Sequence, residues 1–264
     1  MQDGRTLRGY SWMTADRATP DLPSGCRHGP DAPVRAGLII FDCDGVLVDS
    51  EVLSARIEAE ALGTLGIGIG AEEMLERFTG IASRDAYAIL EAEQGIDLPE
   101  GFGKKVLERL YAAFEQQLDP VPGVGAALAA IDLPVCVASS SEPARIERSL
   151  QIVGLHERFA GNLFSAAMVA RGKPAPDLFL HAAERMGVAP AGCVVVEDSV
   201  PGVRAGVAAG MRVIGFTGGS HCGLGYGESL RAAGAGIVLN DMAELPRSLD
   251  GFGETSPLDR QPGP

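Results

Sequence analysis

Short runs of apolar residues recur along the chain from residue 37 onward, and each run is bounded by polar residues or glycine. This pattern is typical of strands that are buried on both faces of a parallel sheet. We expect such strands at 37–41, 134–138, 193–196, 212–216 and 236–239.

Stretches with helical spacing of apolar residues separate these runs, at 123–131, 142–153, 175–186 and 200–209. Strands that alternate with helices of this length imply right-handed βαβ crossovers. The sequence therefore predicts an α/β fold, with a Rossmann-like, doubly wound parallel sheet that is covered by helices on both faces.

The pattern changes between residues 52 and 118. This segment is rich in Ala, Glu, Leu and Arg at spacings of three and four and has no strand-like run, which predicts an all-helical insert. The chain returns from it at a rigid Pro-Val-Pro-Gly segment, 120–123. The insert can therefore cover the carboxyl ends of the strands, where open α/β sheets bind ligands. We expect a core of residues 37–51 and 119–248 and a cap of residues 52–118.

The two terminal segments lack this periodicity. Residues 1–36 carry four prolines, and residues 249–264 are rich in Pro, Asp and Gly, so we expect a disordered arm and a disordered tail. The arm has no apolar stretch typical of a secretory signal, and its aspartates are atypical of a transit peptide. Met13 is an alternative start, so the sequence leaves open whether residues 1–36 belong to the native protein.

Two series of glycines superficially resemble phosphate-binding loops. They are Gly66, Gly68 and Gly70, and Gly223, Gly225 and Gly227. Neither series follows an expected strand and opens a helix at the spacing that a phosphate loop needs. We therefore expect both to be flexible connections.

The net charge of the chain limits the classes of molecule that it can bind. The 264 residues include 22 Lys and Arg against 35 Asp and Glu, a formal net charge of -13 at pH 7. Such a chain is repelled by nucleic acid and by anionic membrane surfaces, and it has no apolar run of about 18 residues that would span a membrane. We expect neither nucleic acid nor membrane as a partner, while the sequence leaves the oligomeric state open.

The cysteines predict a protein of a reducing compartment. The histidines give no sign of a zinc site. The five cysteines are Cys26, Cys43, Cys136, Cys193 and Cys222. Their odd number and the lack of CxxC spacing predict reduced thiols in a cytoplasmic protein. The four histidines are scattered, with no HExxH motif and no Cys/His cluster, so we expect no zinc.

Polar groups that can carry chemistry follow three of the expected strands. Asp42 and Asp44 come after the first strand, Ser139 ends the second, and Glu197 and Asp198 end the third. Because the carboxyl ends of parallel strands meet at one edge of a sheet, we expect these side chains to converge.

Carboxylates that lie this close cannot all stay ionised without a counter-charge. Lys173, in a segment stiffened by two prolines, supplies one positive charge, and a set of oxygen ligands open to a phosphate suits Mg²⁺. Asp42 can then attack phosphorus as an ionised nucleophile and form an aspartyl phosphate. Asp44 bends away from the strand because Gly45 lets the chain turn, and it can act as general acid toward the leaving alcohol and later as base for water.

Each of these features also has an ordinary structural interpretation. An Asp pair after a strand can be a turn or a helix cap, and residues 139–141 and 197–199 can cap the helices that follow them. Lys173 can be a surface lysine. Asp-x-Asp-Gly also occurs in EF-hand loops, but here an expected strand precedes it and the downstream Glu is missing. The joint pattern, and no single residue, favours a catalytic site.

Four segments of the chain carry a resemblance to a known family. The segment FDCDGVLVDS, 41–50, resembles the first motif of the haloacid dehalogenase superfamily, and Val137 to Ser139 resembles the second. Lys173 with PAPDLF resembles the third, and VVVEDSVPG, 194–202, the fourth. The motifs occur in order between residue 37 and about residue 240. The chain is similar to the subgroup with a helical cap, which includes phosphoglycolate and sugar-phosphate phosphatases and β-phosphoglucomutase.

The resemblance implies a role for each acid. Asp42 would be the nucleophile and a Mg²⁺ ligand, and Asp44 would be the acid/base residue whose backbone carbonyl also contacts the metal. Glu197 and Asp198 would complete the metal site. These roles agree with the charge argument, since phosphoryl transfer depends on positioning and on charge stabilisation.

The resemblance also implies a set of substrate contacts. Ser139 and Lys173 would hold the transferring phosphoryl group, with Ser140 beside them. Arg84 lies in a segment that resembles the part of the cap that meets substrate, and its guanidinium suits a carboxylate or a second phosphate. The alternative is a solvated arginine that pairs with Asp85.

We therefore expect a Mg²⁺-dependent phosphatase that acts on a small phosphorylated metabolite, either a sugar phosphate or a phosphoglycolate-like acid, through an aspartyl phosphate. Dehalogenases of the superfamily do without the second Asp, so Asp44 argues against that chemistry. A β-phosphoglucomutase-like mutase is the main alternative, but such mutases carry a His twelve residues after the nucleophile, where this chain has Ser54. A phosphate- or metal-responsive binding protein is an alternative from another class, and the intact pair of aspartates argues against it.

Overall fold

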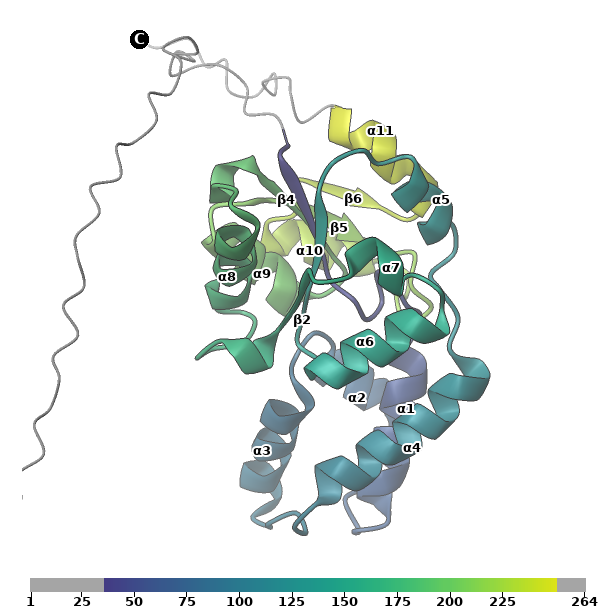
Figure 1. The fold of residues 1–264 in the computed structure, drawn as a ribbon. Coiled ribbons are helices and arrows are strands. Elements are labelled where there is room, and N and C mark those ends of the chain that lie inside the picture. Colours follow the sequence, from purple (N-terminus) through teal and green to yellow (C-terminus); the bar gives the residue numbers. More distant parts are fainter. Residues whose placement is uncertain (1–35, 251–264) are drawn as a thin grey trace, which may run out of the picture. The chain divides into compact units, whose positions relative to one another are not determined.

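The apolar runs of the core form a six-stranded parallel sheet in the computed structural model, which describes residues 36–250 (Figure 1). The strands are β1 (Leu38–Phe41), β2 (Val135–Ser139), β3 (Leu163–Ser165), β4 (Cys193–Glu197), β5 (Arg212–Phe216) and β6 (Ile237–Leu239). Their order in the sheet is β3-β2-β1-β4-β5-β6. The predicted α/β fold with a doubly wound parallel sheet is confirmed.

The strand order places β1 at the centre of the site. The chain steps outward from β1 to β2 and β3, and then outward in the opposite direction from β4 to β6. Phe41 is in register with Val137 on β2 and with Val196 on β4. The residues that follow β1 therefore lie next to the end of β4, at the point where the winding reverses and where such sheets bind ligands.

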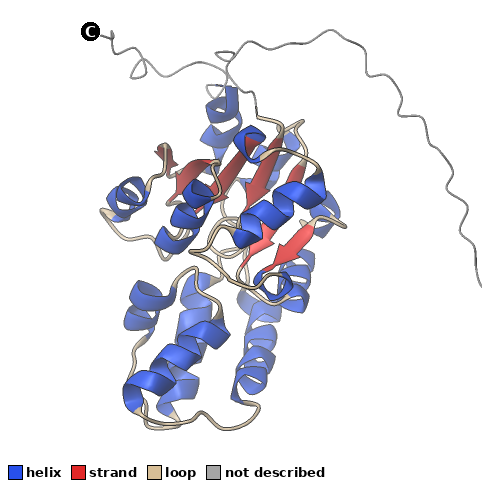
Figure 2. Ribbon diagram, turned by 90° about the vertical axis from the view of Figure 1, so that its left-hand side faces the viewer, coloured by secondary structure: helices blue, strands red, loops and turns tan. Residues whose placement is uncertain are grey.

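Helices cover both faces of the sheet (Figure 2). One face packs against α8 (Asp177–Met186), α9 (Val200–Ala208) and α10 (Tyr226–Ala233). The other packs against α5 (Val124–Ala129), α6 (Pro143–Ile152), α7 (His156–Phe159) and α11 (Leu245–Asp250). Successive residues of β1 alternate between these two layers, with Leu38 and Ile40 on the first face and Ile39 and Phe41 on the second, and all four are fully buried. This double burial explains why the strand sequences are continuously apolar.

The cap consists of helices. They are α1 (Glu51–Gly63), α2 (Ala71–Phe78), α3 (Ser83–Gln94) and α4 (Phe102–Gln117). Buried cap residues such as Leu62, Leu90 and Phe114 belong to the same hydrophobic cluster as Phe41 of the central strand. Core and cap therefore share one continuous hydrophobic interior within residues 36–250. The core and cap boundaries drawn from the sequence stay a prediction.

Two short linkers join the cap to the core, and their backbones are paired. Asp49 N donates a hydrogen bond to Asp119 O (2.9 Å), and Val48 forms an antiparallel bridge with Pro120. We call this paired segment the neck (residues 47–49 and 119–121).

The pattern of apolar residues did not predict some short secondary-structure elements. Strand β3 has only three residues and lies at the edge of the sheet, so its apolar run is too short to stand out. The interpretation of 223–227 as a flexible connection was wrong at Gly227, because α10 starts at Tyr226 after Gly225. The expected disordered arm and tail lie outside the described residues, apart from Ala36, Leu249 and Asp250, and the last two belong to α11.

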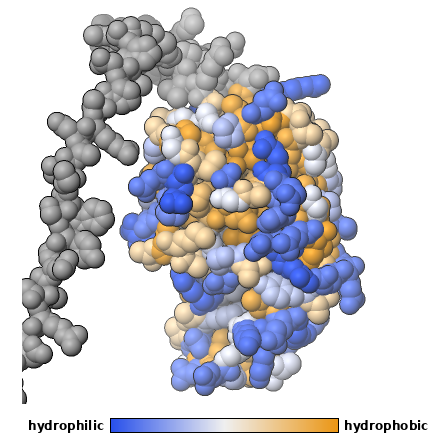
Figure 3. All heavy atoms as spheres, in the orientation of Figure 1, coloured by the Kyte–Doolittle hydropathy of each residue, from blue (hydrophilic) through white to orange (hydrophobic). Residues whose placement is uncertain are grey.

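Hydrophobic residues are exposed on both core and cap. On the face drawn in Figure 3, hydrophilic residues spread over both parts, and the hydrophobic surface is broader on the core than on the cap. The large exposed apolar side chains of the described residues are Val52, Leu65, Ile89, Ile96, Met168, Leu180, Val207 and Leu224. Within residues 36–250, no helix is long and apolar enough to cross a membrane.

The loop between α2 and α3 brings the cap against the core. Ser140 Oγ donates a hydrogen bond to the carbonyl oxygen of Gly80 (2.8 Å). Gly80 has a φ of +81°, and a Cβ placed there would overlap the side chain of Ser199. A glycine is therefore needed at this contact, because any side chain would collide with the core and would disfavour this backbone conformation.

We expect Gly80→Ala to lower the free energy of unfolding by about 1–3 kcal/mol, because the strained φ must be kept while the methyl group meets Ser199. Urea unfolding measures this change. Gly68→Ala is the matched control, since Gly68 is a cap glycine outside the positive φ region with no atom within 4 Å of a Cβ. The control should change stability by less than about 0.5 kcal/mol, and equal losses in the two variants would contradict the assignment.

Candidate active site

A buried lysine holds the carboxylate of Asp42 directly after β1. Lys173 Nζ donates hydrogen bonds to Asp42 Oδ1 (2.7 Å) and to Glu197 Oε1 (2.6 Å). The Lys173 side chain is 1% exposed and that of Asp42 is 5% exposed. Burial alone would lower the pKa of Lys173, but Asp42 and Glu197 outweigh burial and raise it. The lysine is therefore held as a cation.

Glu197 has hydrogen-bond donors on both carboxylate oxygens. Oε1 faces Lys173, while Oε2 accepts hydrogen bonds from the backbone N (2.7 Å) and Oγ (2.9 Å) of Ser199. Ser199 in turn caps α9 by accepting a hydrogen bond from Gly202 N (3.1 Å). A Cβ at Gly202 would overlap the Glu197 carboxylate, so this glycine lets the start of α9 lie against the acid. In this arrangement Glu197 orients Lys173.

Asp198 is the acid of the site that lacks hydrogen-bond donors. Neither of its buried carboxylate oxygens accepts a hydrogen bond from the described residues. His221 Nε2 lies 3.0 Å from Oδ2 but not in hydrogen-bonding geometry. Burial, and then the charge of Glu197, raise the pKa of Asp198 well above its ordinary value, while Lys173 opposes them. A buried carboxylate without donors is costly unless a cation or a proton satisfies it.

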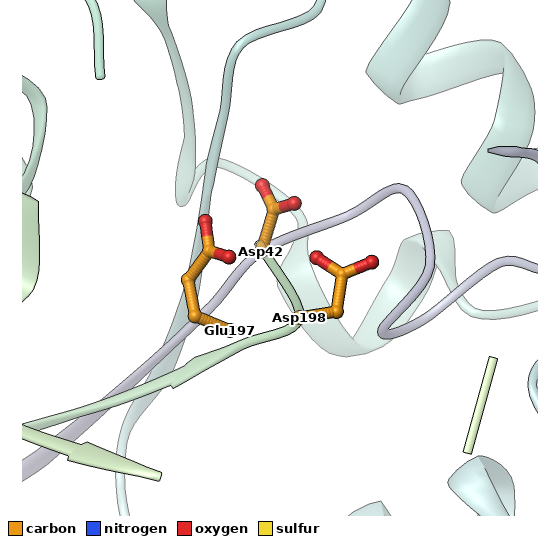
Figure 4. A group of neighbouring side chains, drawn as sticks. All are labelled: Asp42, Glu197 and Asp198. Atoms are coloured by element: carbon orange, nitrogen blue, oxygen red, sulfur yellow. The ribbon is translucent and has the colours of Figure 1, made fainter. Parts of the chain in front are cut away.

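Asp42, Glu197 and Asp198 form one cluster, which we call the acid cluster (Figure 4). Each contributes a carboxylate oxygen, and these oxygens all lie within 4.8 Å of one another. Burial raises the pKa of Asp42 well above its ordinary value; Lys173 opposes this, and the other two acids reinforce it. One ammonium group does not balance three carboxylates, so the cluster can hold a divalent cation. Asp198 and the free oxygen of Asp42 fit this role best, because donors already occupy Glu197.

Asp44 faces a different set of partners. Its Oδ1 accepts hydrogen bonds from Ser50 Oγ (2.6 Å) and Arg145 Nη2 (2.9 Å), and its Oδ2 accepts one from Ser141 Oγ (2.7 Å). Burial alone would raise the pKa of Asp44, but Arg145 and the two hydroxyls outweigh burial and lower it. The structure therefore holds Asp44 as a carboxylate outside the acid cluster. A metal contact through its backbone carbonyl stays a prediction.

The chain turns directly after Asp44, as the glycine in the first motif indicates. Gly45 has a φ of +77°, and a Cβ placed there would overlap the Asp198 carboxylate. The absence of a side chain at this position lets the turn after β1 approach the end of β4. Gly45 thus helps to bring Asp42 and Asp198 together.

The serines at the end of β2 and directly after it order the loop that follows the strand. Ser139 Oγ accepts a hydrogen bond from Ser141 N (3.0 Å) and lies 3.5 Å from Asp44 Oδ2. The hydroxyl of Ser140 is bonded to Gly80 in the cap. The contacts of Ser139 and Ser140 with a phosphoryl group stay predictions.

A cavity of about 360 Å³ lies between cap and core. Asp42 and Asp44 line it on the core side, and residues of all four cap helices line it on the other. Its size suits a small metabolite. Arg84 also lines the cavity, but its side chain is 55% exposed and its Nε lies 3.0 Å from Asp85 Oδ1. The pairing with Asp85 is thus present, and substrate contact by Arg84 stays a prediction.

Sequence reasoning missed three groups at this site. Arg145 lies in the first turn of α6, 101 positions from Asp44, and no spacing signals the contact. His221, beside Asp198, comes from the loop after β5 and looked like an isolated histidine. Ser141 belongs to a serine run whose signal was visible, although the sequence did not indicate which serine reaches Asp44.

We expect Lys173→Met to lower the free energy of unfolding by about 3–5 kcal/mol at pH 7.5, since it leaves two buried carboxylates without their cation. The loss should be smaller at pH 5, because burial raises the pKa of Asp42 and an unpaired acid then takes up a proton. Urea unfolding at both pH values tests this. Lys105→Met, at an exposed position of α4, is the control and should change little. A loss below about 1 kcal/mol at pH 7.5 would refute the role of Lys173.

Curated proteins with similar sequences include two bacterial phosphatases. The 6-phosphogluconate phosphatase of Escherichia coli is 35% identical over 192 residues, which are 71% of this chain and 85% of that protein. The fructose-1-phosphate phosphatase of Escherichia coli is 34% identical over 180 residues, covering 68% of this chain and 95% of that protein.

Solved structures show the same fold. A haloacid dehalogenase-like protein of unknown function from Agrobacterium tumefaciens has 42% identity and a TM-score of 0.72, and the match covers 83% of this chain and 100% of that one. The family model for haloacid dehalogenase-like hydrolases matches residues 37–210. The resemblance stated from the four motifs is thereby confirmed: the chain belongs to the haloacid dehalogenase-like hydrolases.

Proposed function

We propose that the protein is a Mg²⁺-dependent phosphatase that hydrolyses a small phosphorylated metabolite through an aspartyl phosphate. One observation carries this proposal: Asp42 is held by Lys173, belongs to the acid cluster and lines the same cavity as Asp44. The phosphatase relatives act on 6-phosphogluconate and fructose 1-phosphate. They support a phosphorylated sugar or a related phosphorylated acid as substrate.

In the first half of the reaction, a carboxylate oxygen of Asp42 attacks phosphorus. The new bond joins this oxygen to phosphorus, the ester P–O bond breaks, and the leaving alkoxide takes a proton from Asp44. Lys173 keeps Asp42 in place and offsets the negative charge of the phosphoryl oxygens. The products of this step are the free alcohol and the aspartyl phosphate.

In the second half, water attacks the phosphorus atom of the aspartyl phosphate. Asp44 takes the proton of the attacking water, the bond between phosphorus and Asp42 breaks, and inorganic phosphate and the free carboxylate are released. This half-reaction needs Asp44 as an ionised base. The observed hydrogen bonds from Arg145 and Ser141 hold Asp44 in that form. The acid role in the first half requires a protonated Asp44, a form that the charge of Arg145 and the two hydroxyl hydrogen bonds disfavour.

Asp42 and Asp198 would hold the Mg²⁺, with Glu197 beside them. The bound ion would offset the charge of the acids and of the phosphoryl oxygens. Support comes from the donor set, which is all oxygen, and from the buried Asp198 oxygens that accept no hydrogen bond from the described residues.

A mutase activity is not favoured. The position where the mutases carry a histidine is Ser54, and its Oγ accepts a hydrogen bond from Arg145 Nη2 (3.0 Å). Unlike an imidazole, a serine hydroxyl neither gains nor loses a proton near neutral pH. The phosphatase relatives described above support the same choice.

We also propose that the protein acts in the cytoplasm. Cys43, Cys136, Cys193 and Cys222 are free thiols, and the first three are buried. Free thiols are typical of reducing compartments. Cys26 lies outside the described residues.

We expect Asp42→Asn to lower phosphate release at least about a thousandfold, because the amide cannot form the aspartyl phosphate. The assay uses a panel of phosphate esters with MgCl₂, including 6-phosphogluconate and fructose 1-phosphate. Far-UV circular dichroism should show an unchanged fold. Asp132→Asn, at an exposed position, should keep wild-type activity. Retention of a tenth of the activity by Asp42→Asn would exclude this nucleophile.

We expect MgCl₂ to raise the Tm at pH 7.5 and to raise it less at pH 5.5. Metal ligands must be deprotonated, and burial in the first place raises the pKa of Asp42 and of Asp198, so protons compete with the ion at the lower pH. Differential scanning fluorimetry measures both shifts, with KCl at matched ionic strength as control. Asp198→Asn should lose most of the Mg²⁺-dependent rise. An equal rise in this variant, or at both pH values, would contradict the assigned ligands.

A further inference from the structure

Three glutamates line the cavity in addition to Asp42 and Asp44, namely Glu51, Glu58 and Glu142. Glu58, on α1, is 8% exposed and lines the cavity that also reaches Asp42. Its Oε1 accepts hydrogen bonds from Ser83 Oγ (2.9 Å) and Tyr87 Oη (3.3 Å), both on α3. Its Oε2 has no hydrogen-bond partner among residues 36–250. Glu58 therefore keeps one acceptor oxygen that a ligand in the cavity can use.

Within the part of the chain that the structure describes, no cation forms an ion pair with Glu58. Buried glutamates are usually paired with a positive charge, whereas the direct partners of Glu58 are neutral hydroxyl groups. Burial raises the pKa of Glu58, and the charge of Arg145 is the main opposing effect. Arg145 itself donates its hydrogen bonds to Asp44 and Ser54. A structural salt bridge therefore does not explain this carboxyl group.

The cavity has two chemically different walls. Glu58, Ser83 and Tyr87 form a polar wall of hydroxyl and carboxyl groups. Apolar residues of α2 and α4 also line the cavity, namely Met74, Leu75, Phe78, Val106, Leu107 and Leu110. A chain of CH–OH groups matches both walls, because its hydroxyls can bond to the polar side while its C–H groups pack on the apolar side.

We propose that Glu58 selects substrates whose end opposite the phosphate is an uncharged, hydroxylated chain, as in a sugar or polyol phosphate. The inference rests on the proposed phosphatase function and narrows its substrate class. With the phosphate at Asp42, the far end of the substrate meets the cap wall, where the open oxygen of Glu58 accepts a hydroxyl hydrogen bond. A terminal carboxylate would stand against Glu58 in a cavity of low dielectric and would be repelled.

A carboxylate-terminated substrate is the competing possibility, and three cations line the cavity. Arg145 is one of them, but its Nη2 already donates hydrogen bonds to Asp44 and Ser54. Arg84 and Lys104 line the cavity as well, both at exposed positions. Arg84 is paired with Asp85. Exposed cations attract a carboxylate less than a buried acid repels it, because water screens their charge. The observations therefore favour the uncharged chain.

Glucitol 6-phosphate and 6-phosphogluconate form a matched pair of substrates for the test. Both have six carbons and one phosphate, and they differ in a terminal carbon that is an alcohol in one and a carboxylate in the other. The experiment measures kcat/KM for both with wild type, Glu58→Gln and Glu60→Gln. Glu60 is the control, since it lies on the same helix but is exposed and bridged to Arg109. The ratio of the two kcat/KM values does not depend on how much of a variant is folded.

We expect wild type and Glu60→Gln to prefer glucitol 6-phosphate by at least about tenfold, and Glu58→Gln to reduce this preference to less than about threefold. Two results would overturn the role of Glu58: a wild-type preference for 6-phosphogluconate, or an unchanged ratio in Glu58→Gln. Hydrolysis of acetyl phosphate without hydrolysis of either six-carbon ester would overturn it too, while leaving the phosphatase proposal intact. Failure to hydrolyse any ester would instead remove the phosphatase function itself.

Discussion

One buried ammonium group that faces three carboxylates is the constraint on which the site depends. Lys173 is bonded to Asp42 and Glu197. Asp198 completes the acid cluster and accepts no hydrogen bond from residues 36–250. Acids do not gather in this way by local propensity, since each additional like charge raises the cost of ionising the others. The parallel pairing of β1 with β4 imposes the arrangement, because it fixes the two strand ends side by side.

The same constraint explains the small residues around the cluster. Gly45 and Gly202 are both positions where a Cβ would overlap a carboxylate of the acid cluster. One lies in the turn after β1 and the other in the first turn of α9, so the backbone approaches the acids from two elements. These glycines thus let the backbone approach charged groups closely. At both positions, folding costs more conformational entropy than it would for a residue with a side chain.

The sequence predicted the sheet and most of its helices because double burial leaves a clear signal, a continuous apolar run such as 193–196. It also predicted that Asp42, Glu197 and Asp198 converge, since strand ends meet by topology. It could not predict Arg145 at Asp44 or Glu58 in the cavity, because such contacts depend on how cap and core pack and on which way a long side chain turns. It grouped Glu197 with the other acids around a cation, and the hydrogen bonds from Lys173 and Ser199 become visible only in three dimensions.

The neck has a mechanical consequence. Its two chains are linked by the hydrogen bond from Asp49 N to Asp119 O and by the bridge between Val48 and Pro120. They therefore bend together as a single ribbon, which resists twisting and sideways shear more than two free chains would. Any movement of the helical insert relative to the core would therefore bend one paired ribbon, and not two independent linkers.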